Sequence, residues 1–225
     1  MNHKDYSDWF DKIGFCAVFS YNQDDYSILE NRKGFASSFQ FDQNAIVIPK
    51  QVHSKNVCDV KSPGFLEETD GVISKRKEIV LSIQVADCIP LFLVDMTTDY
   101  WGLIHSGWQG TVKNISAEAI YQLQKTGSKS TDIKALIGPS INQCCFEVGA
   151  EVSEQFDSSF SVLGKGNRKM VDLKSVVRHQ LIESGVPAGN IMIDDDCTYC
   201  RSDLYFSFRR EGEKAGRMVA MSGWR

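Results

Sequence analysis

Short apolar runs separated by turn residues dominate the pattern of hydrophobic and polar positions along the chain. Runs of this length, rich in Val, Ile, Leu and aromatic residues, are typical of buried β-strands. Residues 1–45 show no comparable pattern, and we predict irregular structure with a few short strands there. Strands are predicted for residues 45–49, 80–85, 90–94, 100–104, 132–138, 191–193 and 217–221.

Helices are predicted in three places. One follows Gly110, where apolar residues recur every three to four positions and Thr111 can serve as the cap. The others cover residues 150–156 and 172–184. Because strands and helices alternate unevenly, we predict an α/β fold: a single domain over residues 1–225, with mixed β-sheets flanked by helices.

Composition and charge exclude several classes of protein. Of 225 residues, 42% are hydrophobic and 24% charged, as in ordinary globular proteins. The formal net charge is −4 and no block of five Lys or Arg residues occurs, which argues against a nucleic-acid partner. A membrane helix needs roughly 20 mostly apolar residues, and polar residues and a proline interrupt the most apolar stretch, residues 79–96.

The expected setting follows from these exclusions. The N-terminus lacks the basic and then apolar pattern of a signal peptide, so we expect a cytoplasmic protein. We expect a small molecule as its partner, with neither nucleic acid nor a membrane, and a monomer or small homo-oligomer.

The seven cysteines are expected to be free thiols, because their number is odd and no segment directs the chain to an oxidising compartment. Cys197 and Cys200 have the C-x-x-C spacing. A structural zinc site would need a second pair, and the adjacent Cys144 and Cys145 are poorly suited to supply it. We therefore interpret Cys197 and Cys200 as reduced structural cysteines.

His53, Cys88 and His105 form the candidate metal-binding set. His53 follows a predicted strand, Cys88 lies between two apolar strands, and His105 ends a strand before a turn with two glycines. Zinc accepts imidazole and thiolate ligands, and three protein ligands leave a fourth position open, as catalytic sites require. The spacings are not those of zinc fingers, so the residues alone also allow a buried cysteine with two hydrogen-bonded histidines.

Three arginines stand among glycines near the C-terminus: Arg209, Arg210 and Arg217. Arginine binds phosphate or carboxylate in bidentate fashion, so this run is a candidate anchor for an anionic substrate. A solvated turn before the last strand explains the same residues equally well.

Seven ordered motifs, from about residue 45 to the end of the chain, resemble the laccase-domain family. This family is described as multicopper polyphenol oxidase-like and also as a purine nucleoside phosphorylase family. The motifs are Gln51-Val-His53, Thr69-Asp-Gly71, Ala86-Asp-Cys-Ile-Pro90, His105-Ser-Gly-Trp108, Ile137-Gly-Pro-Ser-Ile141, Phe146-Glu-Val-Gly149 and Phe206-Ser-Phe-Arg-Arg210.

The resemblance implies both a fold and an activity. The fold would be a single α/β/α domain of mixed sheets, similar to cysteine hydrolases of the deamidating-toxin type. The activity would be phosphorolysis of adenosine, inosine, guanosine and methylthioadenosine, or deamination of adenosine, with zinc held by His53, Cys88 and His105.

Roles for individual residues follow from the motifs and the chemistry together. We predict Cys88, His105 and the neighbouring Asp87, a candidate proton shuttle, as catalytic residues. The predicted substrate-binding residues are Gln51, Gln109, Ser140, Arg209, Arg210 and Arg217.

Two departures from the family pattern weigh against phosphorolysis more than against the metal site. Gln109 stands where the family usually has an arginine. Residues 15–30 contain nothing like the family's Thr-x-Arg-x-Gly-Gly segment, although Asn31-Arg32 fits the Asn-Arg that follows it. Phosphorolysis requires an anion to be held while the glycosidic bond breaks, whereas deamination requires only an activated water.

Three alternatives remain open. A copper polyphenol oxidase would need many histidine ligands, and the chain has four histidines, so copper is less expected than zinc. A metal-free thiol hydrolase or amidase would use Cys88 as nucleophile and His105 or His53 as base. A relative that binds a nucleoside without converting it is the third.

Overall fold

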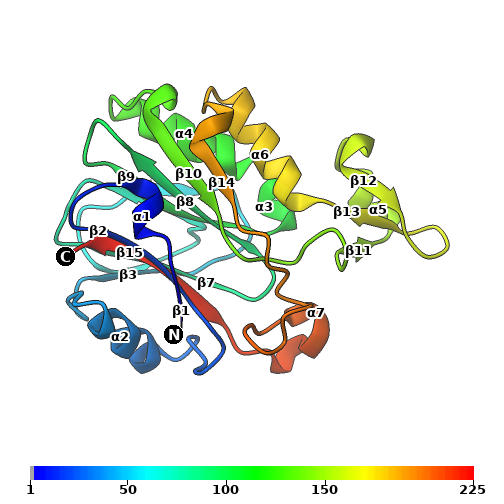
Figure 1. Cartoon of the computed structure of the whole chain (residues 1–225), viewed down its shortest axis with the longest axis horizontal. Helices are drawn as coiled ribbons and strands as arrows, with labels where there is room; N and C mark the ends of the chain where they lie inside the picture. Colours follow the sequence, from blue (N-terminus) through cyan, green and yellow to red (C-terminus); the bar gives the residue numbers. More distant parts are fainter. Residues whose placement is uncertain (1–2) are drawn as a thin grey trace.

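Two six-stranded mixed sheets lie at the centre of the molecule (Figure 1), for which the computed structural model describes residues 3–225. The strands of the first sheet are, in order, β1 (His3–Asp5), β2 (Phe15–Ser20), β15 (Met218–Trp224), β7 (Val80–Val85), β3 (Ile46–Pro49) and β5 (Gly64–Leu66). Those of the second are β14 (Ile191–Ile193), β10 (Ile133–Ile137), β8 (Ile89–Asp95), β9 (Trp101–Ser106), β6 (Gly71–Ser74) and β4 (Val57–Asp59).

Helices cover the outer faces of both sheets, which gives four layers (Figure 1). α2 (Leu29–Ser38) packs on the first sheet, and α4 (Ile115–Lys125) and α6 (Leu173–Glu183) pack on the second. A third core, which includes Phe92 and Trp101, fills the space between the sheets. Because both faces of each sheet are covered, central strands such as β8 are continuous apolar runs. The predicted α/β class with mixed, helix-flanked sheets is confirmed.

The remaining elements are short. A three-stranded sheet projects from one side of the molecule, in the order β11 (Glu147–Val148), β13 (Lys169–Val171) and β12 (Ser161–Leu163). The short α-helices are α1 (Ser7–Phe10), α3 (Trp108–Val112), α5 (Ala150–Ser153) and α7 (Phe208–Glu211). Single 3₁₀ turns cover Ser130–Asp132, Ser158–Phe160, Ala188–Asn190 and Gly212–Lys214. No helix within the described residues is long and apolar enough to cross a membrane.

The N-terminal region differs most from the sequence prediction. From residue 3 onward it is not irregular: β2 pairs with β15 near the middle of the first sheet, and α2 covers that sheet. All six β2 residues are buried, so the strand shows no alternation of apolar and polar positions. α2 carries buried Arg32 beside Phe35 and Ala36, which obscures an amphipathic pattern.

The helix predicted after Gly110 is divided in two. α3 begins earlier, at Trp108, and α4 begins after Asn114, whose left-handed backbone (φ 60°) interrupts the helix while its side chain accepts a hydrogen bond from the Ala117 N–H. The helix predicted for residues 150–156 ends at Ser153, whereas that at 172–184 is confirmed as α6. All seven predicted strands are present, to within a few residues. Six short strands were missed: β4, β5, β6, β11, β12 and β13.

Candidate metal centre

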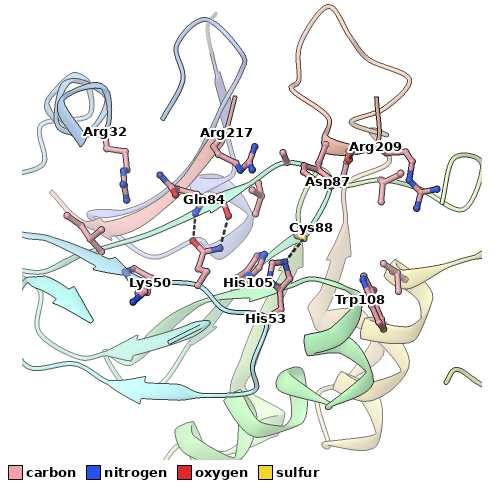
Figure 2. Close-up of a pocket in the computed structure, with 18 of the residues that line it drawn as sticks. Arg32, Lys50, His53, Gln84, Asp87, Cys88, His105, Trp108, Arg209 and Arg217 are labelled. Carbon is pink, nitrogen blue, oxygen red and sulfur yellow. Dashed lines mark hydrogen bonds between the residues drawn. The ribbon is translucent and has the colours of Figure 1, made fainter. Parts of the chain in front are cut away.

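Three donor side chains meet near the connections that lead from the first large sheet to the second. His53 lies between β3 and β4, Cys88 between β7 and β8, and His105 on β9 (Figure 2). The ligand atoms of the three residues all lie within 4.8 Å of one another, and Cys88 Sγ is 3.9 Å from His53 Nε2. Tetrahedral zinc with bonds of about 2.0–2.3 Å places its nitrogen and sulfur ligands about 3.5 Å apart. Two imidazoles and a thiolate at these separations fit a zinc ion.

Asp70, on the loop before β6, orients His105 and the segment that carries His53 through hydrogen bonds. Its buried carboxylate accepts hydrogen bonds from the backbone N–H groups of Val52, His53 and Ser54, at 3.2, 3.0 and 2.7 Å. It also accepts one from the Ser54 hydroxyl at 2.7 Å and lies 2.8 Å from His105 Nδ1. With Nδ1 donating to Asp70, His105 presents Nε2 to the metal position, as metal-bound histidines commonly do.

The charges around the three donor side chains favour a thiolate at Cys88. Burial opposes ionisation of Cys88, but the charges and hydrogen bonds of His105 and His53 lower the pKa of its thiol to about 6. Burial also opposes protonation of His105, yet the Cys88 thiolate and Asp70 raise the pKa of its imidazole to about 9. Burial would raise the pKa of the Asp70 carboxyl, but hydrogen bonds from His105 and Ser54 hold it well below its usual range. A thiolate suits a zinc site and a thiol nucleophile alike.

The backbone is constrained around the three donors. His53 and Asp87 both have positive φ, 57° and 81°, which is uncommon for residues other than glycine and recurs at functional sites. Gly107, just after β9, approaches the donors closely. A Cβ added there would lie 2.8 Å from the His53 ring and 2.9 Å from Cys88 Sγ.

We therefore expect Gly107→Ala to displace two donor side chains and to weaken metal binding by at least about tenfold, since metal sites demand close geometry. Competition with a chelator indicator measures the zinc affinity. The matched control is Gly34→Ala on α2, where an added Cβ meets nothing within 4 Å. Equal zinc affinity in both variants would show that the donors do not need the space at Gly107.

A cavity of about 810 Å³ opens beside the three donors, within the range of about 300–1,000 Å³ typical of small-molecule sites. Its lining includes four basic side chains, those of Arg32, Lys50, Arg209 and Arg217, against two acidic ones (Figure 2). Of the acidic residues, Glu67 pairs with Lys50 at 2.9 Å, and the carboxylate of Asp87 accepts hydrogen bonds from other residues of the protein. Trp108, Phe146 and Phe208 provide aromatic surface to the same cavity.

Arg32 is the least compensated charge in this cavity. Only 7% of the residue is exposed, and its guanidinium makes one long hydrogen bond, 3.4 Å from Nη2 to the Ser27 carbonyl oxygen. Its Nε has no partner, and no carboxylate among residues 3–225 lies within ion-pair distance. Burial of an unpaired charge is costly, so an anionic ligand is the natural partner for Arg32.

Four of the predicted catalytic and substrate-binding residues other than the metal donors line this cavity. Arg209 and Arg217 do so with their guanidinium groups partly engaged, Arg209 with the Glu147 carbonyl at 2.6 Å and Arg217 with the carbonyl of Gly216 at 3.1 Å. Gln51 also lines the cavity, but its amide is paired with the backbone of Gln84, at 2.7 and 2.8 Å. The fourth is Asp87.

Both carboxylate oxygens of Asp87 are hydrogen-bonded within the protein. Oδ1 accepts from the Thr198 hydroxyl at 2.6 Å, and Oδ2 accepts from the Ser207 hydroxyl at 3.0 Å and the Arg209 N–H at 2.7 Å. These bonds fix the connection between β7 and β8, which carries Cys88. A proton-shuttle role for Asp87 stays a prediction, and it would require one of these bonds to open.

The other three predicted residues lie outside the cavity lining. Gln109 is exposed on α3, and Ser140 is fully buried. Arg210 donates to the backbone carbonyls of Thr198 and Tyr205, at 3.0 and 2.6 Å. Their predicted role in substrate binding stays a prediction without a contact to support it.

Sequence reasoning missed two important residues of the site. Asp70 is part of the Thr69-Asp-Gly71 motif, which was the available signal for it. Arg32 belongs to the Asn31-Arg32 pair that fits the family, but it lies before the region of continuous resemblance. Neither residue is adjacent in sequence to a metal donor, so its role depends on tertiary contacts.

Comparison with known protein families agrees with the motifs. The family model described as "Multi-copper polyphenol oxidoreductase laccase" matches residues 15–225. The chain belongs to this family. The match confirms the resemblance to laccase-domain proteins and extends it to the N-terminal strand β2.

Relatives in the laccase-domain family carry two kinds of name. Adenosine deaminase RL5, from an unknown prokaryotic organism, is 32% identical over 207 residues, covering 84% of this chain and 79% of the relative. Purine nucleoside phosphorylase YlmD of Bacillus subtilis is 33% identical over 217 residues, covering 88% and 78%. The crystal structure of YlmD from Geobacillus stearothermophilus matches with a TM-score of 0.89 and 25% identity, covering 95% of this chain and 93% of that one.

Proposed function

We propose that this chain is a zinc-dependent enzyme that cleaves purine nucleosides by phosphorolysis. The observation that carries the proposal is the cavity, in which the His53–Cys88–His105 donor set and four basic side chains line one space. Relatives named purine nucleoside phosphorylase and adenosine deaminase support the substrate class.

Phosphorolysis requires a phosphate anion to be held while the glycosidic bond breaks, and the basic side chains of the cavity can do this. A phosphate oxygen forms a bond to the ribose C1′, while the bond from C1′ to the purine nitrogen breaks and its electron pair leaves with the base, which then takes up a proton. Arg32 is desolvated and lacks an acidic partner, so it can hold the phosphate, and Arg217 can share its charge. Positive charge for phosphate is therefore available in the cavity without an arginine at position 109.

The aromatic residues suit the other half of the substrate. Trp108 and Phe146 expose ring surface to the cavity beside the donor set, and a purine base can lie against such surfaces. Zinc held by His53, Cys88 and His105 would supply a Lewis acid that stabilises negative charge on an oxygen.

Replacing Arg32 with methionine tests the phosphate assignment. We expect the KM for phosphate to rise at least about tenfold, because a hydrogen bond to a charged group contributes about 1.5–3 kcal/mol. Thermal stability should stay level or rise, since the substitution removes a buried and unpaired charge. Steady-state kinetics with phosphate varied, together with a melting curve, measures both.

Lys33→Met is the matched control, because Lys33 is the next residue of α2 and pairs with Glu30 at 2.8 Å away from the cavity lining. Its phosphate KM should equal that of the wild type. An unchanged phosphate KM in Arg32→Met would remove Arg32 from the anion site.

The reaction itself is identified by its products. The protein is incubated with adenosine and with inosine, each with and without phosphate, and the products are separated by chromatography. Free base that appears only with phosphate supports the proposal. The absence of product from both nucleosides, with and without phosphate, would overturn the nucleoside assignment.

Adenosine deamination is the second candidate, favoured by the open position that a three-ligand site leaves beside the cavity. It uses water instead of phosphate, so inosine would form from adenosine in either buffer. Arg32→Met should leave this reaction unchanged, which separates the two activities in one variant.

A further inference from the structure

Four cysteines that the sequence interpretation kept apart lie together in the structure. Cys144 and Cys145 follow β10, and Cys197 and Cys200 lie between β14 and α7. Their sulfur atoms are all within 4.8 Å of one another, so the adjacent pair, which was expected to be poorly suited, does lie where it can complement the C-x-x-C pair. The turn at residues 142–145 directs both neighbouring side chains toward the same point, which the spacing alone does not reveal.

The sulfur separations suit a metal ion better than a disulfide. Cys145 Sγ is 3.4 Å from Cys200 Sγ, and Cys144 Sγ is 3.6 Å from Cys145 Sγ and 3.8 Å from Cys200 Sγ. A disulfide requires about 2.05 Å. Four sulfurs around zinc, each at about 2.3 Å, stand about 3.8 Å apart in a tetrahedron.

Burial in the core does not explain the cluster. Cys144 and Cys200 are exposed and Cys145 is half-buried, so only Cys197 is a core residue. Core packing therefore does not account for the positions of Cys144 and Cys200, whereas structural zinc sites commonly use four cysteines.

The backbone around the cluster is fixed by its own hydrogen bonds. The Thr198 N–H donates to the Ser140 carbonyl at 3.1 Å, and the Asn142 side chain donates to the Asp195 carbonyl at 2.8 Å. The Asn142 N–H also points at Cys197 Sγ, at 3.4 Å, and such N–H contacts support thiolate ligands. These hydrogen bonds hold the two cysteine segments side by side.

We propose that Cys144, Cys145, Cys197 and Cys200 bind a second zinc ion in a closed, four-thiolate structural site. With four protein ligands, this site leaves no position for substrate. Its place in the fold gives it a function: Thr198, between two of the ligands, donates to Asp87, and Arg210 donates to the Thr198 carbonyl. The ion would thus stabilise the segment around Thr198, which in turn holds the connection between β7 and β8 that carries Cys88.

The test is a zinc count on the full chain, purified under reducing conditions without chelator. We expect two zinc ions per chain in the wild type by elemental analysis and native mass spectrometry. Cys200→Ser should retain one, and the control Cys58→Ser, a half-buried cysteine outside both donor sets, should retain two. His53→Ala should also retain one zinc, the ion of the four-cysteine site. This count does not depend on nucleoside activity, so the two proposals can fail separately.

Cobalt substitution in the wild type and in His53→Ala provides a readout that needs no cysteine variant. A four-thiolate site gives strong sulfur-to-cobalt charge transfer that persists when His53 is replaced. One zinc in the wild type, none in His53→Ala, and four cluster thiols that react freely with a thiol reagent in the folded protein would overturn the proposal. A disulfide among the four under reducing conditions would do the same.

Discussion

Replacing Cys88 with alanine is expected to abolish zinc binding at the His53–Cys88–His105 site and to lower kcat/KM for inosine by about 1,000-fold or more. The thiolate is the one anionic ligand of the set, and the pKa of its thiol, lowered to about 6, keeps it charged at neutral pH. A Lewis acid contributes several kcal/mol to a reaction of this kind, and about 4 kcal/mol corresponds to that factor. Zinc content and steady-state kinetics measure the two effects.

A second substitution at the same position separates the metal enzyme from a thiol hydrolase. Zinc accepts carboxylate ligands, so Cys88→Asp should recover part of the zinc affinity and part of the activity that Cys88→Ala loses. A thiol nucleophile has no such substitute, and its activity would also survive chelation. Cys58→Ala is the control, because Cys58 belongs to neither donor set and its thiol lies 3.5 Å from the Thr69 hydroxyl. Activity in Cys88→Ala equal to the wild type would remove Cys88 from the reaction.

Asp70→Asn is expected to lower zinc affinity by about 10- to 100-fold, although Asp70 is not itself a donor to the metal. Its carboxylate accepts from three backbone N–H groups and from Ser54 and His105, and an amide nitrogen in that position would face these donors. Loss of the partner that orients a metal-bound histidine typically has an effect of this size. Buried donors left unpaired cost about 1–3 kcal/mol each, so thermal stability should also fall.

The readout for Asp70→Asn is the zinc dissociation constant, which a general loss of stability does not change while the chain is folded. The control is Asp59→Asn on β4, an exposed residue whose carboxylate pairs with Lys61. Zinc affinity equal to the wild type in folded Asp70→Asn would show that His105 keeps its orientation without this hydrogen bond.

How much of the fold could be predicted depended on the pattern in each segment. The strands β7, β8 and β9 are short apolar runs between turn residues, and the sequence located them to within a few residues. A few short strands were expected in residues 1–45, but β2 was not located, because burial on both faces removes the alternation of a half-exposed strand. The break at Asn114 was missed because a left-handed residue and its cap leave the apolar spacing on either side intact.

The site was predictable to a similar extent. His53, Cys88 and His105 could be selected as donors by residue type, by local turns and by the family motifs. Arg32 could not, because its importance comes from burial without a partner, which is a tertiary property. Arg210 shows the opposite case: its sequence context resembles an anion anchor, yet its guanidinium is occupied by backbone carbonyls.

We propose that this cavity transfers the ribosyl group of a purine nucleoside to phosphate, and phosphorus NMR of the wild type with inosine and phosphate follows this transfer. We expect a new phosphomonoester signal of ribose 1-phosphate, which grows in step with hypoxanthine and is absent from Cys88→Ala. A phosphate signal that stays unchanged, whether inosine persists or free ribose is formed, would contradict it.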